Sequence, residues 1–302
     1  MQSKVSVIIP TYNRPKLIQR AIKSVLNQTH QNFEVVIIDD SQDNETEKVV
    51  NDILNDKRIK YIKNQVKKNV SFARNEGVRE SSLDSKYIAF LDDDDEFLPT
   101  FLEKTVQRLE EKKDLIGVTS YIDFRTTEGL RLGIERKPIK EFWRTRIGNG
   151  WVLRRELFIK ENIWFDERQV FDELDFGIWV AKDHKIDCVS EALRIYYGYS
   201  VGKKPSFVFL DGAAGAKLFL NKYYSLYSCL GRKALGFFYS TIGRAFCQSS
   251  EIKQGRKNLL KAFLAYPRPD YFLFYLVGLL FPGLFQNSFL RILKRRIFQG
   301  KI

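Results

Sequence analysis

Two groups of aspartates in this sequence each follow a run of apolar residues. Asp39 and Asp40 follow the run FEVVII, and Asp92, Asp93, Asp94 and Asp95 follow the run YIAFL. Four adjacent carboxylates repel one another, and only a cation or a special local geometry makes such a run tolerable. Carboxylate oxygens without histidine or cysteine nearby suit a hard divalent ion. These residues therefore predict a Mg²⁺ or Mn²⁺ site that substrate phosphates complete.

Alternating strand and helix signals place both aspartate groups at one edge of a sheet. The repeated units predict an α/β fold with a mostly parallel sheet and helices on both of its faces. The carboxyl ends of the strands in such a sheet form its ligand-binding edge. Apolar runs predict strands at 5–10, 33–38, 59–62, 87–91 and 115–122, and apolar periodicity predicts helices from 15, at 46–54, at 70–81 and at 99–112.

The aspartate run also has a plainer interpretation. Residues 92–95 could form a solvated loop whose acids cap the helix expected from residue 99. A second aspartate pair on the same edge favours a ligand site over that interpretation. Haloacid-dehalogenase-like phosphatases and receiver domains carry an essential aspartate after the first strand, whereas Pro10-Thr11-Tyr12 stands there in this chain.

Charge is divided unevenly along the chain. The 302 residues carry a net charge of +13, but residues 201–302 hold 17 basic and 3 acidic side chains, whereas the first 200 hold 33 and 34. This division argues against nucleic-acid binding by the main domain and indicates an anionic partner for the last third.

Cysteine and histidine usage excludes several kinds of site. Three cysteines without a CxxC pair support neither a disulfide framework nor a zinc site, and two histidines cannot form a histidine-ligated metal cluster. The apolar run at residues 5–10 is too short for a signal peptide, so we expect a cytoplasmic protein.

Beyond residue 122 the alternation loosens. Residues 125–146 are charged and rich in turn formers, and the sequence then predicts a strand at 151–153, a helix at 171–182 and short strands at 187–189 and 193–197. From about residue 205 the pattern is helical. We therefore expect a catalytic domain at 1–205 and a helical, basic region at 206–302.

Three stretches resemble the family 2 glycosyltransferases, which have the GT-A fold. They are VSVIIPTYNRPKLIQRAIKSVLNQTHQNFEVVIIDDSQDN, NVSFARNEGV and YIAFLDDDDEFLP, in the family's order and spacing. A looser similarity continues through FDERQVFDELDF and EALRIYY to about residue 200. The final hundred residues match nothing that fixes an activity.

The resemblance implies a nucleotide-sugar site. Pro10, Thr11 and Tyr12 would form one wall of the nucleotide pocket, with the Tyr12 ring against the base. Asp40 would accept a hydrogen bond from the base, and Arg74 would face the nucleotide from the helix at 70–81. Ordinary strand-end packing of Tyr12 and a surface ion pair of Arg74 are the alternatives.

The DXD motif of that family corresponds to Asp92-Asp93-Asp94. Asp92 and Asp93 would contact ribose or diphosphate, and Asp94 would ligate Mn²⁺ or Mg²⁺ directly. Because four aspartates stand in a row, the register is ambiguous by one residue, and Asp95 could take part of this role.

Inverting transfer requires a base for the acceptor hydroxyl. In the family this base is the second acid of a Glu-Asp pair, and this chain has the reversed pair Asp172-Glu173. Glu173 occupies the base position if no gap intervenes, with Asp172 as its competitor. Acids at a helix start that merely complement the helix dipole are the alternative.

These residues predict an inverting hexosyltransferase that moves a sugar from a nucleotide-sugar donor, with UDP favoured, to a glycan or lipid-linked acceptor. Synthesis of cell-surface polysaccharide or lipid-linked oligosaccharide is the expected setting. The alternatives are a metal-dependent nucleotidyl- or phosphotransferase, and a non-catalytic scaffold that binds nucleotide sugars.

The basic C-terminal region predicts attachment to an anionic membrane surface. Residues 271–290 lack charge, but Pro282-Gly283 interrupts them, so a shallow insertion is expected rather than a span. Five basic residues between 291 and 301 then alternate with apolar ones. The enzyme is thus expected on the cytoplasmic face of the membrane. The alternative is a helical subdomain whose charge is merely solvated.

Overall fold

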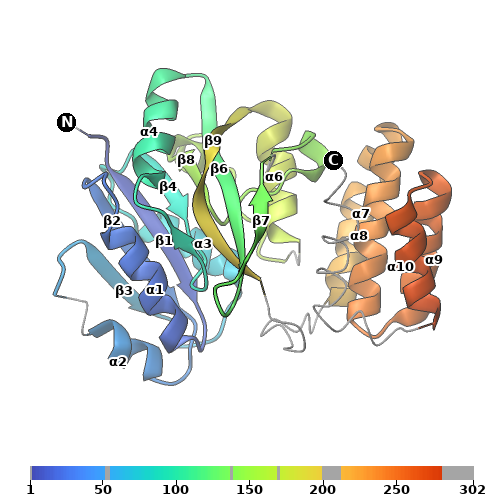
Figure 1. Cartoon of the computed structure of the whole chain (residues 1–302), viewed down its shortest axis with the longest axis horizontal. Coiled ribbons are helices and arrows are strands. Elements are labelled where there is room, and N and C mark those ends of the chain that lie inside the picture. The colour runs from blue at the N-terminus through green and yellow to red at the C-terminus, as the bar shows by residue number, and fades with distance from the viewer. Residues whose placement is uncertain (1, 52–54, 137–138, 169–170, 199–211, 281–302) are drawn as a thin grey trace. The chain divides into compact units, whose positions relative to one another are not determined.

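The computed structural model describes residues 2–51, 55–136, 139–168, 171–198 and 212–280 (Figure 1). Two compact units divide the chain. The first contains Met1–Glu167 and Asp172–Gly198, and the second contains Arg168–Phe171 and Tyr199–Ile302. The boundary expected near residue 205 lies outside the described residues.

A nine-stranded sheet forms the centre of the first unit, in the order β3-β2-β1-β4-β8-β6-β9-β5, with β7 paired to β6 (Figure 1). The strands β3, β2, β1 and β4 are parallel, whereas β8 is antiparallel to both β4 and β6. The α/β fold is as predicted, with a parallel first half and a mixed second half. The bounds are β1 Val5–Thr11, β2 Phe33–Asp39, β3 Ile59–Lys63, β4 Tyr87–Phe90, β5 Glu96–Phe97, β6 Leu115–Thr126, β7 Arg131–Glu135, β8 Trp151–Arg154 and β9 Lys185–Gly198.

Three strands differ from the sequence prediction, among them the short β5, for which no strand was predicted. The short strands expected at 187–189 and 193–197 are one strand, β9, in which Ser190 and Glu191 bulge out of the pairing with β6. The bulge interrupts the apolar alternation without ending the strand. The strand β7 lies in the segment expected to be turn-rich, and its residues are mostly exposed, so burial imposes no pattern on them.

Helices cover both faces of the sheet, and their positions follow from the period-2 alternation of β1. Val5, Val7 and Ile9 face a core shared with α1 (Pro15–Leu26) and α4 (Phe101–Glu111). Ile8 faces the opposite core, shared with α3 (Val70–Glu80) and α6 (Asp172–Asp183). The short helices are α2 (Glu45–Asn51), the 3₁₀ turn η1 (Phe142–Arg144) and α5 (Glu156–Ile159).

The helix α3 packs unusually close to β1 because Gly77 has no side chain. A Cβ atom at this position would lie 2.2 Å from Cγ2 of Ile8. Since Ile8 is fully buried, a larger residue at position 77 would push the helix away from the sheet.

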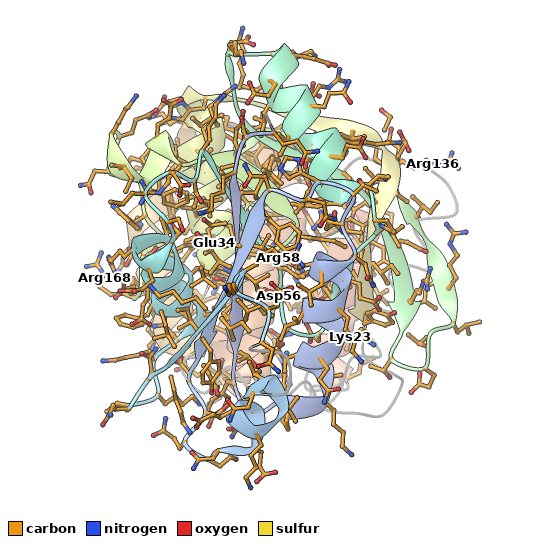
Figure 2. All side chains as sticks on the ribbon, turned by 90° about the vertical axis from the view of Figure 1, so that its left-hand side faces the viewer. Lys23, Glu34, Asp56, Arg58, Arg136 and Arg168 are labelled. Carbon is orange, nitrogen blue, oxygen red and sulfur yellow. The ribbon has the colours of Figure 1, made fainter. Side chains whose placement is uncertain are left out.

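Polar contacts hold the end of the sheet that lies away from the strands' carboxyl ends. Glu34 of β2 accepts hydrogen bonds from the Ser82 amide at 2.7 Å and the Ser82 hydroxyl at 2.6 Å, and from Ser6. In the turn before β3, Arg58 pairs with Asp56 at 2.7 Å; Figure 2 labels Glu34, Asp56 and Arg58. Burial raises the pKa of Glu34, but the hydrogen bonds from Ser6 and Ser82 outweigh the effect of burial and leave that pKa below its usual value.

The second unit is helical in its described part, as the sequence predicts. Its helices are α7 (Gly212–Cys229), α8 (Arg232–Gln248), α9 (Ile252–Ala265) and α10 (Pro269–Leu280). Rings of α7 and α8 pack together, with Tyr227 and Phe238 stacked at 4.5 Å. Within the described ranges, no helix combines the length and hydropathy that crossing a bilayer requires.

Candidate functional site

The carboxyl ends of β1, β2 and β4 meet at one edge of the sheet, as predicted. Thr11 lies opposite Asp39 in the register of β1 and β2, and the Asp40 amide donates to the Thr11 carbonyl at 3.0 Å. On the other side of β1, Ile8 pairs with Phe90, two residues before Asp92. The aspartates and the Pro10-Thr11-Tyr12 segment therefore share this edge.

Three of the four consecutive aspartates converge. Asp92, Asp94 and Asp95, here called the acidic cluster, each offer a carboxylate oxygen within 4.8 Å of the others. Burial raises the pKa of Asp92 to about 6, and the nearby Glu173 and Asp94 carboxylates add to the rise. Burial and carboxylate neighbours also raise the pKa of Asp94 and, most strongly, that of Asp95. Each of these carboxylates would be stabilised by a cation at this position.

The fourth aspartate, Asp93, points elsewhere. Its Oδ2 accepts a hydrogen bond from the Thr11 hydroxyl at 2.8 Å, and its Oδ1 lies 2.7 Å from Nη1 of Arg14. The same Arg14 nitrogen lies 2.9 Å from Oδ2 of Asp94. Asp93 thus joins β1 to the aspartate run, and Arg14 neutralises part of its charge. The sequence analysis did not single out Arg14, although it follows the Pro10-Thr11-Tyr12 segment by two residues.

Arg74 holds the opposite side of the acidic cluster. Its guanidinium donates from Nη2 to Asp92 Oδ1 at 2.9 Å and from Nη1 to Asp172 Oδ2 at 2.5 Å. Nη2 also lies 3.3 Å from Oε1 of Glu173. Only 3% of the Arg74 side chain is exposed, so the surface ion pair considered as its alternative is excluded. Arg74 joins the two groups of acids that the sequence assigned to separate roles.

Asp172 and Glu173 begin α6 and reach the same edge as the acidic cluster. Asp172 is 17% exposed and bound at short distance by Arg74, whereas Glu173 is 26% exposed and holds Arg74 through a longer contact. Burial raises the pKa of Asp172 to about 6, and Glu173 adds to the rise. Both acids are therefore placed beside the cluster rather than merely at a solvated helix start.

Asp40 is enclosed by the segment between β3 and α3. Its Oδ1 accepts from Asn64 Nδ2 at 2.8 Å, and its Oδ2 accepts from the Lys68 amide at 3.2 Å. Burial is the main cause that raises its pKa. Asp39 instead accepts from the Tyr61 hydroxyl at 2.6 Å and from the Ser41 amide at 2.8 Å, and these bonds brace the turn after β2.

Pro10 and Thr11 end β1 as buried residues, while Tyr12 is partly exposed. The Tyr12 ring lies under the Lys67 ammonium at 4.2 Å. Tyr12 and Lys67 therefore stand on the same side of the strand edge as Asp40, which Lys68 contacts.

Asn149 bonds to the acids directly and Arg194 supports Asn149, and neither residue was predicted from the sequence. Asn149 donates a hydrogen bond to Asp95, and Arg194 donates to the Asn149 carbonyl at 2.6 Å. The only signal for them was the Gly148-Asn149-Gly150 segment, which resembles a weak GxG pattern. Neither residue lies in a cluster of its own type, so composition and spacing do not reveal them.

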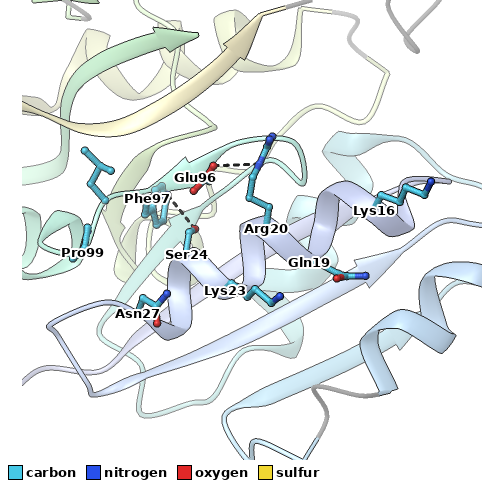
Figure 3. A pocket seen from close by; sticks show the side chains of 10 residues that line it. Lys16, Gln19, Arg20, Lys23, Ser24, Asn27, Glu96, Phe97 and Pro99 are labelled. Carbon is cyan, nitrogen blue, oxygen red and sulfur yellow. Dashed lines mark hydrogen bonds and ion pairs between the residues drawn. The ribbon is translucent and has the colours of Figure 1, made fainter. Parts of the chain in front are cut away.

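A hollow of about 480 Å³ lies beside this site, between α1 and residues 96–99 (Figure 3). Arg20 separates the two, because its side chain pairs with Glu96 at 3.2 Å and donates to the Asp94 carbonyl at 2.5 Å. Lys16 and Lys23 line the hollow, and none of the clustered acids does. The hollow is therefore distinct from the acidic cluster.

The acidic cluster fits a divalent cation by its donor chemistry. Its three carboxylates supply hard oxygen ligands without competing nitrogen or sulfur, the set that Mg²⁺ and Mn²⁺ prefer. Burial is the main cause of their raised pKa values, and neighbouring carboxylates, whose charge Arg14 and Arg74 compensate only in part, add to the rise.

Comparisons with known proteins agree with this geometry. Residues 6–171 match the family described as Glycosyl transferase family 2. A glycosyltransferase of Rickettsia bellii is 44% identical over 119 residues, covering 39% of this chain and 17% of the relative. The GalNAc(5)-diNAcBac-PP-undecaprenol beta-1,3-glucosyltransferase of Campylobacter jejuni is 39% identical over 110 residues, covering 36% and 35%. This chain spans under a fifth of the length of the Rickettsia relatives.

Solved structures share the fold. S. aureus TarS in complex with UDP-GlcNAc superimposes with a TM-score of 0.56 at 18% identity, covering 91% of this chain and 92% of that one. The mannosyltransferase PcManGT from Pyrobaculum calidifontis, in complex with GDP-Man and Mn²⁺, gives 0.59 at 14% identity, covering 100% and 89%. These likenesses establish a GT-A-like glycosyltransferase fold.

Replacing Arg74 tests how far the site depends on one buried cation. Arg74→Gln leaves Asp92, Asp172 and Glu173 without their shared partner, so the free energy of unfolding should fall by about 3–5 kcal/mol. Urea unfolding at pH 8 measures this change. The control Arg79→Gln, on the same helix but half exposed, should cost less than about 1 kcal/mol. Equal stability of the two variants would contradict the central role of Arg74.

Proposed function

This chain belongs to glycosyl transferase family 2, and from that premise we propose that it transfers a sugar from a nucleotide-sugar donor to an acceptor hydroxyl with inversion. The convergence of the acidic cluster with Asp172 and Glu173 at one sheet edge carries this proposal. It brings a site for a donor diphosphate next to a carboxylate that can take a proton from the acceptor.

Asp94, with Asp92 and Asp95, would hold the cation, Mn²⁺ or Mg²⁺. A bound divalent cation neutralises the charge that develops on the departing diphosphate. The Mn²⁺ in the mannosyltransferase complex supports this assignment. Asp93, which Thr11 and Arg14 hold in place, would then serve the ribose or diphosphate side of the donor.

Asp40 and Tyr12 would bind the base of the nucleotide. A carboxylate at Asp40 can accept a hydrogen bond from uracil N3–H, and the Tyr12 ring can stack on the base. We therefore propose UDP as the nucleotide, with Pro10 and Thr11 as the floor of its pocket. The UDP-GlcNAc complex of TarS supports such a donor. Arg74 acts on the site indirectly, because it fixes the position of Asp92. A direct contact between Arg74 and the nucleotide stays a prediction.

Glu173 is the proposed base. Its contacts with Arg74 and with the Asn149 amide both fall on Oε1, so within the described residues Oε2 is the oxygen left to take the acceptor proton. Asp172 has a pKa near neutrality, which would suit a base, but Arg74 binds its Oδ2 at 2.5 Å. Arg74 holds Asp172 by this short contact and Glu173 by a contact of 3.3 Å, so Glu173 is the more weakly held of the two acids, which favours Glu173 as the base.

The acceptor and the setting follow from the same proposal. We propose a glycan or lipid-linked hydroxyl as acceptor, in synthesis of cell-surface polysaccharide or lipid-linked oligosaccharide. The Campylobacter relative is named for an undecaprenol-linked acceptor, which supports the lipid-linked case.

We also propose that α9 and α10 place the enzyme on the cytoplasmic face of an anionic membrane. Residues 212–280 carry ten basic and two acidic side chains. One exposed stripe of α9 combines positive charge with apolar side chains, the two features of an interfacial helix. The stripe consists of Lys253, Lys257, Leu260, Lys261 and Leu264. The basic residues between 291 and 301 lie outside the described residues.

Asp94→Asn tests the cation assignment. The amide keeps the size of the side chain but loses the charge, so Mn²⁺-dependent hydrolysis across a panel of UDP- and GDP-sugars should fall at least about 100-fold. Thermal unfolding should stay near that of the parent. The control Asp84→Asn makes the same substitution, and so removes the same single negative charge, at an exposed position. Near-normal turnover of Asp94→Asn at saturating Mn²⁺ would refute the assignment.

Glu173→Gln tests the base. The variant should retain donor and Mn²⁺ affinity but lose about 100-fold or more in transfer, the usual effect of losing a general base. Asp172→Asn is the matched comparison, because it changes the adjacent acid in the same way. If Asp172→Asn alone shows this loss, Asp172 is the base.

Membrane attachment is tested with the lysines of the α9 stripe. Replacing Lys253, Lys257 and Lys261 with Gln should weaken sedimentation with phosphatidylglycerol vesicles about 100-fold at low salt, at about 1 kcal/mol per charge. Replacing Lys48, Lys160 and Lys185, exposed in the first unit, is the control of equal charge. Equal vesicle binding by the two variants would refute a role of the α9 stripe in membrane attachment.

Point substitutions are a sharper test than removal of residues 271–302. Such a truncation would cut α10, whose Phe274 and Val277 pack in a core with Cys247 and Leu259. Loss of vesicle binding would then follow from unfolding as well as from loss of a membrane contact.

A further inference from the structure

Asn149 lies between η1 and β8, and each of its four polar groups is bonded to a different residue of the site. Its side-chain oxygen accepts from the Asp92 amide at 3.0 Å, and its side-chain nitrogen donates to Asp95 Oδ2 at 2.5 Å. Its backbone amide donates to Glu173 Oε1 at 3.0 Å, and its carbonyl accepts from Arg194 Nη1 at 2.6 Å. One residue therefore touches both ends of the acidic cluster and the proposed base.

The two glycines beside Asn149 make room for these contacts. A Cβ atom on Gly148 would lie 2.7 Å from Oε1 of Glu173, and one on Gly150 would lie 1.9 Å from Nη1 of Arg194. Gly150 also has a φ of +74°, which side chains rarely adopt. The Gly148-Asn149-Gly150 order is thus required by the carboxylate on one side and the guanidinium on the other.

An amide is the side chain that these neighbours demand. The Asp92 backbone amide can only donate and an ionised Asp95 can only accept, so the residue between them must do both at once. An aspartate would place another carboxylate against Asp95. An apolar residue of similar size would leave the Asp92 amide and the Asp95 carboxylate without these partners.

We propose that Asn149 is a positioning residue that fixes the acidic cluster and the Glu173 carboxylate in one arrangement. This inference rests on the proposed function, in which the cluster holds the cation and Glu173 is the base. Asn149 acts through Asp92, Asp95 and Glu173 rather than on the substrate. Its loss should therefore disturb cation binding and turnover while donor recognition at Asp40 and Tyr12 is retained.

The test measures Mn²⁺ binding to the full-length protein without donor, by the electron paramagnetic resonance signal of free Mn²⁺. Asn149→Ala should weaken binding about 10–100-fold, the usual effect of removing a residue that orients metal ligands. The control Asn32→Ala, an exposed amide that bonds to the Gln2 carbonyl, should leave Mn²⁺ binding unchanged. Asn149→Ser, which keeps one hydroxyl, should give an intermediate loss and serves if Asn149→Ala does not fold.

Coupling to Asp95 separates positioning from a general loss of structure. In an Asp95→Asn background, Asn149→Ala should weaken Mn²⁺ binding by a clearly smaller factor than in the parent protein, because one of the contacts through which Asn149 acts is already altered. In steady-state transfer, Asn149→Ala should lower kcat at least about 10-fold and change KM for the donor less than about 3-fold.

The outcomes are distinct. Additive losses in the double variant, or unchanged Mn²⁺ binding in Asn149→Ala, overturn the inference while the proposed function stands. Absence of Mn²⁺ binding by the parent protein overturns the cation assignment and, with it, this inference. A fall in kcat with coupled loss of Mn²⁺ affinity supports it.

Discussion

Crowding of negative charge at one edge of the sheet is the constraint on which the rest of the site depends. Six carboxylates, those of residues 92–95 and 172–173, meet there. Arg14 pairs with Asp93 and Asp94, and Arg74 pairs with Asp92, Asp172 and Glu173. Arg74 can reach three acids because α3 lies close to β1, and Gly77, three residues further along the same helix face, permits that approach. The close packing of α3 on β1 is therefore needed for Arg74 to compensate the charge of these acids.

The two arginines compensate the acids differently. Arg74 is almost fully buried and joins acids from β4 and α6, so it belongs to the framework of the site. Arg14 is more exposed and binds Asp93 and Asp94 on the open side. Burial is the main cause of the raised pKa values of the acidic cluster, and the excess of carboxylates over nearby guanidinium groups adds to the rise. A divalent cation is the simplest complement to that excess.

The sequence predicts the parts of this structure that burial dictates. The apolar runs of β1, β2 and β4 are buried on both faces, so their pattern is continuous and the acids at their ends stand out. Where burial is weaker the pattern fails: β7 is exposed, and the bulge in β9 breaks the alternation. Arg14, Asn149 and Arg194 were missed for a related reason. Each is a single polar residue whose role comes from neighbours distant in sequence.

The proposed polarity of the donor follows from where the charges lie. An anionic diphosphate is repelled by the acidic cluster unless a cation is bound there. Among the described residues, the opposite end of this sheet edge does not carry such a concentration of carboxylates. There Lys67 lies over Tyr12, and the backbone of Lys68 bonds to Asp40, so positive charge, an aromatic face and one carboxylate occur together. A nucleotide base is the part of the donor that suits this end. In the proposed reaction the diphosphate would extend toward Asp94, and the sugar it carries would lie nearest to Glu173, where proton removal from the acceptor is needed.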